Sequence, residues 1–133
     1  MKREILFRGK RENNGKWTEG FYVCISGTKH YILTGNPVIA PHRVDVEFYK
    51  IIPETVGQFT GLTDKNGTKI FEGDVIENIT NHNTAVVRWY EEHAAFMLHS
   101  KLKHKVYFLY DNDFKSINVI GNIYDNPELL KGV

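Results

Sequence analysis

The sequence predicts a mainly-β protein with at most short helical turns. Short apolar segments recur along the 133 residues at intervals of about 8–12 residues, separated by turns rich in Gly, Asn and Pro. Almost no stretch shows the 3.6-residue period of an amphipathic helix. Aromatic residues are abundant, with 8 Phe, 7 Tyr and 2 Trp, and large rings supply apolar area to a small β-protein that lacks covering helices.

The first part of the chain reads as hairpins. Residues 5–10 and 16–26 are expected to pair across a turn that ends at Gly15, and residues 30–33 form the next strand. Residues 34–42 contain a glycine and two prolines, which predicts an irregular loop. Residues 44–52 follow as a half-buried strand, because Val, Val and Phe alternate there with acidic residues.

Two chain reversals mark the centre of the sequence. Asn66-Gly67 is a strong hairpin signal, since both residues tolerate a positive φ, and Gly73 allows a second reversal soon afterwards. Asn126-Pro127 is suited to begin a terminal helical turn. The strands expected between these points are residues 74–79, 84–90, 94–99, 106–110 and 116–123.

These segments predict two subdomains that fold together. Residues 1–56 form an N-terminal β-hairpin subdomain, and residues 57–133 form a small SH3-like β-barrel subdomain. The barrel prediction depends on a Gly-Asp corner that leads into a strand and is followed by three more strands, a likeness of pattern that implies no activity.

Charge and cysteine content limit the classes of partner. The 17 Lys and Arg residues nearly balance the 16 Asp and Glu residues, so the net charge of +1 does not favour nucleic acid or an anionic membrane as the main partner. The basic clusters at residues 8–11 and 101–105 are interpreted as solvated strand ends and a loop.

Cys24 is the only cysteine, which suits a reducing cytosol, and its apolar neighbours predict a small buried side chain. No segment approaches the ~20 apolar residues that span a bilayer.

The sequence does not contain the motifs of common metal, nucleotide or hydrolase sites. Asp64 and Asn66 resemble the start of an EF-hand loop, but Lys69 and Val75 occupy the positions that require Gly and Glu. Asp74 and the nearby Glu72 are interpreted as turn-capping groups. The six histidines lack zinc-ligand spacing, and phosphate-binding loops and nucleophile elbows are absent. We therefore expect no catalytic, cofactor-binding or metal-binding residues and no enzyme activity.

One structured alternative is a small barrel that binds single-stranded nucleic acid. Such proteins combine aromatic platforms with basic side chains. Arg88 and Tyr90 supply that combination on one predicted strand, and Lys105 and Tyr107 supply it on another. Alternation places Arg88 and Tyr90 on one face of their strand and Trp89 on the other. Core or subunit contacts are the favoured interpretation of these aromatic residues.

Several long motifs resemble the YopX family, whose members are small proteins of bacteriophages and prophages. The resemblance spans nearly the whole chain and is most specific in the central and C-terminal motifs. The residues that carry it are Ile5-x-Phe7-Arg8-Gly9, Gly15-Lys16-Trp17, Pro53-Glu54-Thr55-Val56-Gly57-Gln58-Phe59-Thr60-Gly61-Leu62, Asp64-Lys65-Asn66-Gly67, Ile70-Phe71-Glu72-Gly73-Asp74 and Val119-Ile120-Gly121-Asn122-Ile123-Tyr124-Asp125-Asn126-Pro127-Glu128-Leu129-Leu130.

This resemblance implies an intracellular, mainly-β phage protein that assembles into oligomers, and it transfers no catalytic or binding residues. Together with the near-neutral charge, it favours a non-enzymatic accessory protein that acts through protein contacts in the bacterial cytoplasm. Self-association and an unidentified phage or host protein are the expected contacts, because unpaired strand edges are readily satisfied by a symmetric neighbour. Single-stranded nucleic acid remains the alternative partner.

Overall fold

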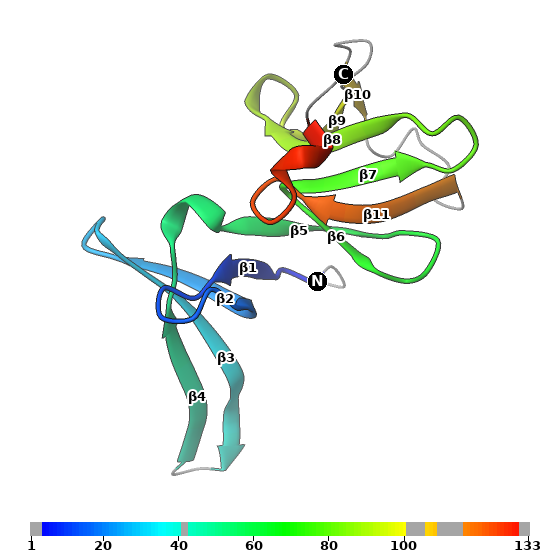
Figure 1. The fold of residues 1–133 in the computed structure, drawn as a ribbon. Helices are drawn as coiled ribbons and strands as arrows, with labels where there is room; N and C mark the ends of the chain where they lie inside the picture. The colour runs from blue at the N-terminus through cyan, green and yellow to red at the C-terminus, as the bar shows by residue number, and fades with distance from the viewer. Residues whose placement is uncertain (1–3, 41–42, 101–105, 109–115, 131–133) are drawn as a thin grey trace. The chain divides into compact units, whose positions relative to one another are not determined.

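A computed structural model describes residues 4–40, 43–100, 106–108 and 116–130 (Figure 1). It confirms a mainly-β protein, and the helices among the described residues are short 3-10 turns. The chain divides into two compact units, Met1–Phe59 and Thr60–Val133, whereas the sequence placed the boundary after residue 56. Unit 1 and unit 2 are described separately below.

Unit 1 is an antiparallel arrangement of five strands in the order β4-β3-β2-β1-β5 (Figure 1). Their bounds are β1 Phe7–Lys10, β2 Trp17–Ile25, β3 Lys29–Ala40, β4 Arg43–Lys50 and β5 Gly57–Thr63, the last of which continues into unit 2. The β1–β2 hairpin is the one predicted from the sequence. Gly15 adopts φ +71° at its turn, and its N–H donates to the Arg11 carbonyl at 2.9 Å.

Ile32 and Ile51 form the apolar centre of unit 1, since both are almost fully buried. Close backbone approach accompanies this packing. A Cβ on Gly20 would lie only 2.1 Å from the Leu33 carbonyl oxygen, so β2 and β3 fit together only because this residue has no side chain. Residues Pro53–Thr55 form a 3-10 turn, where Thr55 Oγ1 accepts a hydrogen bond from the Lys10 N–H at 2.9 Å.

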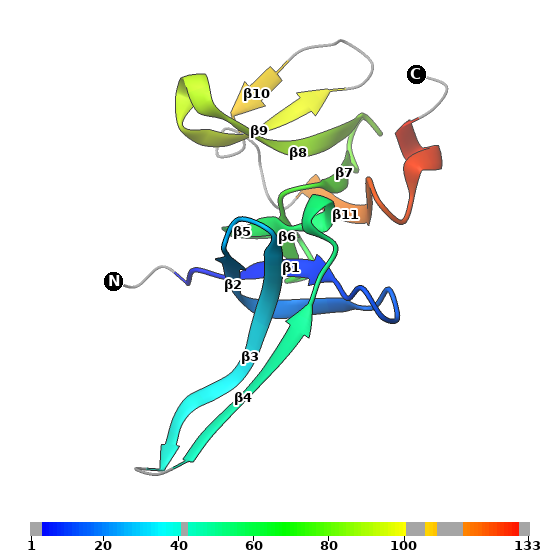
Figure 2. The ribbon, with the colours of Figure 1, turned by 90° about the vertical axis from the view of Figure 1, so that its left-hand side faces the viewer.

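The prediction of an irregular loop over residues 34–42 is wrong for residues 34–40, because β3 continues to Ala40, and residues 41–42 lie outside the described residues. Among the described residues, β2 pairs with β3 only as far as Leu33, and beyond that point Thr34, Gly35, Asn36 and Ala40 pair with β4. A register shift between Asn36 and Ala40 surrounds Pro37, whose missing N–H is tolerated at an irregular, singly paired edge. Both ribbon views show β3 and β4 running past the end of β2 as a two-stranded arm (Figures 1 and 2).

Unit 2 contains a five-stranded antiparallel sheet in the order β10-β9-β8-β7-β11 (Figure 2). Its strands are β7 Asp74–Asn78, β8 Thr84–Tyr90, β9 Ala95–Ser100, β10 Val106–Phe108 and β11 Ile117–Asn122. The end of β5 and β6 (Lys69–Phe71) form the predicted hairpin, and Gly67 adopts φ +81° at its turn. A second 3-10 turn spans Glu91–His93.

The closed SH3-like barrel is not found among the described strands. β10 and β11 are the two ends of the sheet, and no ladder joins them in the described part of the chain. Instead, Ile70 of β6 packs against the sheet through a cluster that also contains Ile76, Val87, Leu98 and Ile117. Side-chain packing, rather than a closed hydrogen-bonded barrel, therefore joins β6 to the sheet. The predicted terminal turn is present as a 3-10 helix at Pro127–Leu130.

Candidate functional site

The carboxylates of the two central turns bind the backbone. Asp64 Oδ1 accepts hydrogen bonds from the N–H groups of Asn66 at 2.8 Å and Thr68 at 2.9 Å, and its Oδ2 accepts one from Val119 at 3.0 Å. Burial raises the pKa of Asp64, but these three donors outweigh it, so the pKa lies below its ordinary value. Asp74 Oδ2 accepts from the Phe71 N–H at 2.7 Å. Both carboxylates therefore hold turns in place, as interpreted from the sequence for Asp74.

Metal-binding residue types do not cluster in the part of the chain that the structure describes, where no group of three His, Cys, Asp or Glu side chains converges. The described histidines have local partners. His30 Nδ1 lies 2.6 Å from the Tyr22 hydroxyl, and His82 Nδ1 lies 3.9 Å from a Glu77 carboxylate oxygen. Within the described residues, no helix is both long and apolar enough to cross a membrane.

The prediction that Cys24 is buried is wrong, because its side chain is exposed. Cys24 lies near the end of β2 and pairs with His30 of β3. Its neighbour Ile25 on the other face is also exposed, at 47%. The apolar neighbours in the sequence therefore indicate a strand but give no information about whether other residues cover its end.

The residues predicted to bind single-stranded nucleic acid in the alternative function do not form one surface. Arg88 and Tyr90 alternate with Trp89 along β8, as predicted. The register places Leu98 opposite both Val87 and Tyr107, so Tyr107 lies on the same face as Val87 and on the opposite face from Arg88 and Tyr90. Lys105 lies outside the described residues. The structure thus groups Arg88 with Tyr90 and separates Tyr107 from both.

Apolar side chains gather on one face of the β2–β3–β4 sheet in unit 1. Phe21 lies opposite Leu33, and Leu33 lies opposite Phe48, so the three form a row across three strands. Phe21 and Phe48 are 57% and 62% exposed. This surface, called the apolar face below, consists of Phe21, Val23, Ile25, Tyr31, Leu33 and Phe48.

On the opposite side of the same strands, the centre is packed around Ile32. Ile32, which alternates with Tyr31 and Leu33, has no exposed area and lies between Tyr22 and Tyr49 in the register. On the apolar face itself, Tyr31 and Phe48 make an edge-to-face contact with ring centroids 6.4 Å apart. Ile32 is therefore buried on one side of the strands, and the rings of Tyr31 and Phe48 lie on the other. The alternation along residues 44–48 in the sequence predicted which residues share one face of β4. The row across three strands could not be predicted, because it depends on the register in which the strands pair.

A cavity of about 240 Å³ lies in unit 2. Its apolar lining comes from Ile76, Ala85, Leu98 and Ile117, and its polar lining comes from Asn78, Asn81, Asn83, Thr84, Ser100 and Tyr107. None of these side chains carries a charge at neutral pH. The lining residues are drawn from β7, β8, β9, β10, β11 and the loop between β7 and β8.

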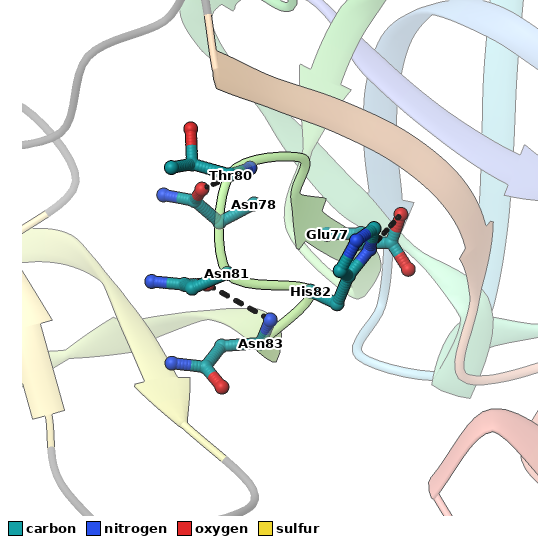
Figure 3. A network of polar contacts seen from close by, with 6 residues as sticks. All are labelled: Glu77, Asn78, Thr80, Asn81, His82 and Asn83. Atoms are coloured by element: carbon teal, nitrogen blue, oxygen red, sulfur yellow. Dashed lines mark hydrogen bonds and ion pairs between the residues drawn. The ribbon is translucent and has the colours of Figure 1, made fainter.

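The loop between β7 and β8 is held by its own asparagines. Asn78 Oδ1 accepts a hydrogen bond from the Thr80 N–H, and Asn81 Oδ1 accepts one from the Asn83 N–H, both at 2.9 Å. Figure 3 shows Asn78, Asn81 and Asn83 on one side of the loop and His82 with Glu77 on the other. The sequence showed this segment as an Asn-rich loop, but it did not indicate that the loop borders a cavity with Ser100 and Tyr107.

Comparisons with known proteins identify a family and a solved structure that is similar to this chain. A family model described as YopX protein matches residues 6–131. The crystal structure of protein EF1440 from Enterococcus faecalis is similar over 97% of this chain and 99% of that chain, with 21% sequence identity and a TM-score of 0.48. A search of curated proteins gave no match.

Proposed function

The chain belongs to the YopX protein family, and on this basis we propose that it is a non-enzymatic accessory protein of a bacteriophage or prophage. It acts through protein contacts as a homo-oligomer in the cytoplasm of the bacterial host. The proposal that the chain forms a homo-oligomer is based on the apolar face of unit 1. Contiguous exposed apolar side chains rimmed by polar ones mark protein interaction sites.

The composition of the apolar face suits a protein partner. Aromatic residues are enriched at the centres of protein interfaces, and Phe21, Tyr31 and Phe48 contribute three rings to this surface. Lys50 follows Phe48 on the same side of β4 and pairs with Tyr31 in the register, so a charged residue borders the rings. A second copy of the chain presents the same apolar surface and can cover it through a two-fold contact.

The edge of this sheet supports the same proposal. β4 is the edge strand at one end of the strand order in unit 1, and the part of β3 beyond Leu33 has β4 as its single ladder partner among the described residues. Two-stranded ribbons are marginally stable in water and gain from a third strand or a covering surface. A neighbouring copy would provide such a partner for the arm formed by β3 and β4.

Light scattering coupled to size-exclusion chromatography tests this function. The wild-type chain is expected to elute as an oligomer at high micromolar concentration, and Phe48→Ser is expected to shift it toward the monomer. Loss of a central aromatic contact costs about 2 kcal/mol of association free energy, which weakens the dissociation constant about 30-fold. Val106→Ser, which removes an exposed apolar side chain from unit 2, is the matched control. A wild-type monomer at high micromolar concentration would contradict the assembly.

The same preparation separates this function from single-strand nucleic-acid binding. A fluorescent single-stranded oligonucleotide is titrated at low salt against the wild-type chain and Arg88→Ala. We expect no salt-dependent binding, because Arg88 and Tyr107 lie on opposite faces of the unit 2 sheet. Tight binding that Arg88→Ala weakens would favour the nucleic-acid function.

A further inference from the structure

The asparagines beside the unit 2 cavity are oriented by the backbone of their own loop. A backbone N–H requires an acceptor, so the oxygen of the Asn78 side chain must face the Thr80 N–H and that of Asn81 must face the Asn83 N–H. This fixes the orientation of both carboxamides, and their NH₂ groups point away from these contacts. Figure 3 shows the amide nitrogens of Asn78, Asn81 and Asn83 on the same side of the loop.

The loop that carries these donors is held at both ends. The Asn78 N–H donates to the Asn83 carbonyl at 2.9 Å, and the His82 N–H donates to the Asn78 carbonyl at 2.7 Å. The Ile79 N–H also donates to the Ser116 carbonyl at 2.8 Å. The donors are therefore positioned before any ligand arrives, which lowers the ordering cost of binding.

The rest of the cavity offers apolar and aromatic surface. Ile76, Leu98 and Ile117 are almost fully buried and belong to the core cluster of unit 2. Tyr107, on the same face as Leu98, also lines the cavity and is 41% exposed. The ring of a tyrosine is a platform on which a flat molecule can stack.

The volume and charge of the cavity limit what it can hold. Pockets for drug-sized ligands usually measure about 300–1,000 Å³, so about 240 Å³ suits a smaller molecule of one ring with its substituents. No lining residue among those described is Lys, Arg, His, Asp or Glu, so an ionic ligand would lose its hydration without gaining a counter-charge.

We propose that this cavity binds an uncharged planar heterocycle that carries carbonyl groups, of the uracil or thymine type. The carbonyl oxygens accept hydrogen bonds from the NH₂ groups of Asn78 and Asn81, and the flat ring contacts the apolar lining and Tyr107. The lining residues that the structure describes include no cation for a phosphate group, so the proposal assigns recognition to the base itself. The site is separate from the apolar face of unit 1 and does not depend on self-association.

The test is a titration of the ¹⁵N-labelled full-length chain with uridine, followed by amide chemical shifts. Shifts confined to residues 78–84, 98–100 and 107 with a dissociation constant of about 1 mM or tighter are expected for a ligand of this size. Asn81→Asp keeps an oxygen for the Asn83 N–H but replaces the NH₂ donor with a charged oxygen. We expect it to weaken uridine binding about tenfold or more.

Two controls complete the experiment. Asn13→Asp adds the same charge in a turn of unit 1 and should leave uridine binding unchanged. A six-nucleotide oligouridylate distinguishes a free base from a strand: equal, salt-independent affinities identify the free base, whereas tighter, salt-dependent binding at the same residues identifies a strand as its source. Absence of shifts at 10 mM uridine, shifts elsewhere in the chain, or unchanged binding by Asn81→Asp would overturn the proposal.

Discussion

At the scale of single residues, Asp64 connects two parts of unit 2 that are far apart in the sequence. Its carboxylate accepts hydrogen bonds within its own turn and from Val119 of β11. Asp64→Asn would place an NH₂ group against one of these N–H donors, because a carboxamide has one oxygen. We expect a loss of about 1–3 kcal/mol in the free energy of unfolding, measured by urea denaturation at neutral pH. An unchanged midpoint would contradict this role.

The lowered pKa of Asp64 also predicts how stability depends on pH. Its pKa in the folded chain lies below the unfolded value of about 3.9, so the folded state favours the charged form. The resulting stability is fully present above the unfolded pKa and is lost as the pH falls through the folded pKa. Denaturation at a series of pH values should therefore show a shallower acid decline for Asp64→Asn than for wild type. Glu92→Gln, which removes an exposed carboxylate, should retain the wild-type decline.

Gly20 shows a different constraint, since the space for a side chain is taken by backbone. A Cβ at this position would lie 2.1 Å from the Leu33 carbonyl oxygen, and a main-chain oxygen cannot rotate away. We expect Gly20→Ala to destabilise the chain by about 3 kcal/mol or more, measured as the shift in the thermal midpoint. Gly27→Ala, where nothing lies within 4 Å but φ is +72°, should cost only about 1 kcal/mol. Similar costs for both variants would refute the steric explanation.

At the scale of elements, the sequence predicted strands well where clear turns bound a strand and the strand pairs regularly with its neighbours. The bounds of β8 agree with the sequence prediction, because apolar residues and clear turns define this strand. The prediction failed over residues 34–42, where Gly35 and Pro37 suggested a loop. Proline is excluded from a strand only where the ladder needs an N–H donor at that position. In this part of β3, β4 is the one ladder partner among the described residues.

The candidate surfaces were less predictable than the strands, because they depend on register. The row formed by Phe21, Leu33 and Phe48 exists only when three strands are aligned. Likewise, the cavity combines an Asn-rich loop with Ser100, Tyr107 and Ile117, which are distant in the sequence. Sequence patterns indicate which face of a strand a residue occupies, but not which residues lie opposite it.

The arm formed by β3 and β4 predicts uneven protection within one strand. Residues 31–33 of β3 lie between β2 and β4, whereas residues 34–36 have β4 as their single partner in the described part of the chain. In the Phe48→Ser chain at low concentration, amides of the arm should exchange hydrogen about tenfold faster or more than those of residues 31–33. Hydrogen exchange followed by NMR measures this difference. Equal protection along β3 would show that the arm is stable on its own.

At the scale of the whole molecule, the 17 basic and 16 acidic residues nearly balance. The salt dependence of assembly therefore distinguishes association through the apolar face from association through charged contacts. Contacts through the apolar face should persist or strengthen when salt rises from about 0.05 M to 0.5 M, since screening weakens only electrostatic attraction. Light scattering across that range measures the oligomer mass. A mass that falls toward the monomer at high salt would indicate that charged contacts, rather than the apolar face, hold the assembly.

The exposed thiol of Cys24 makes the chain suitable for single-site labelling. Because the sequence contains one cysteine, a maleimide dye or spin label attaches at one position without any substitution. That position lies on β2, one residue from Val23 and one from Ile25 of the apolar face. A reporter at Cys24 would thus register a neighbouring copy through energy transfer or dipolar broadening. The same thiol requires a reductant during such work, because air oxidation would join two chains covalently and imitate an assembly.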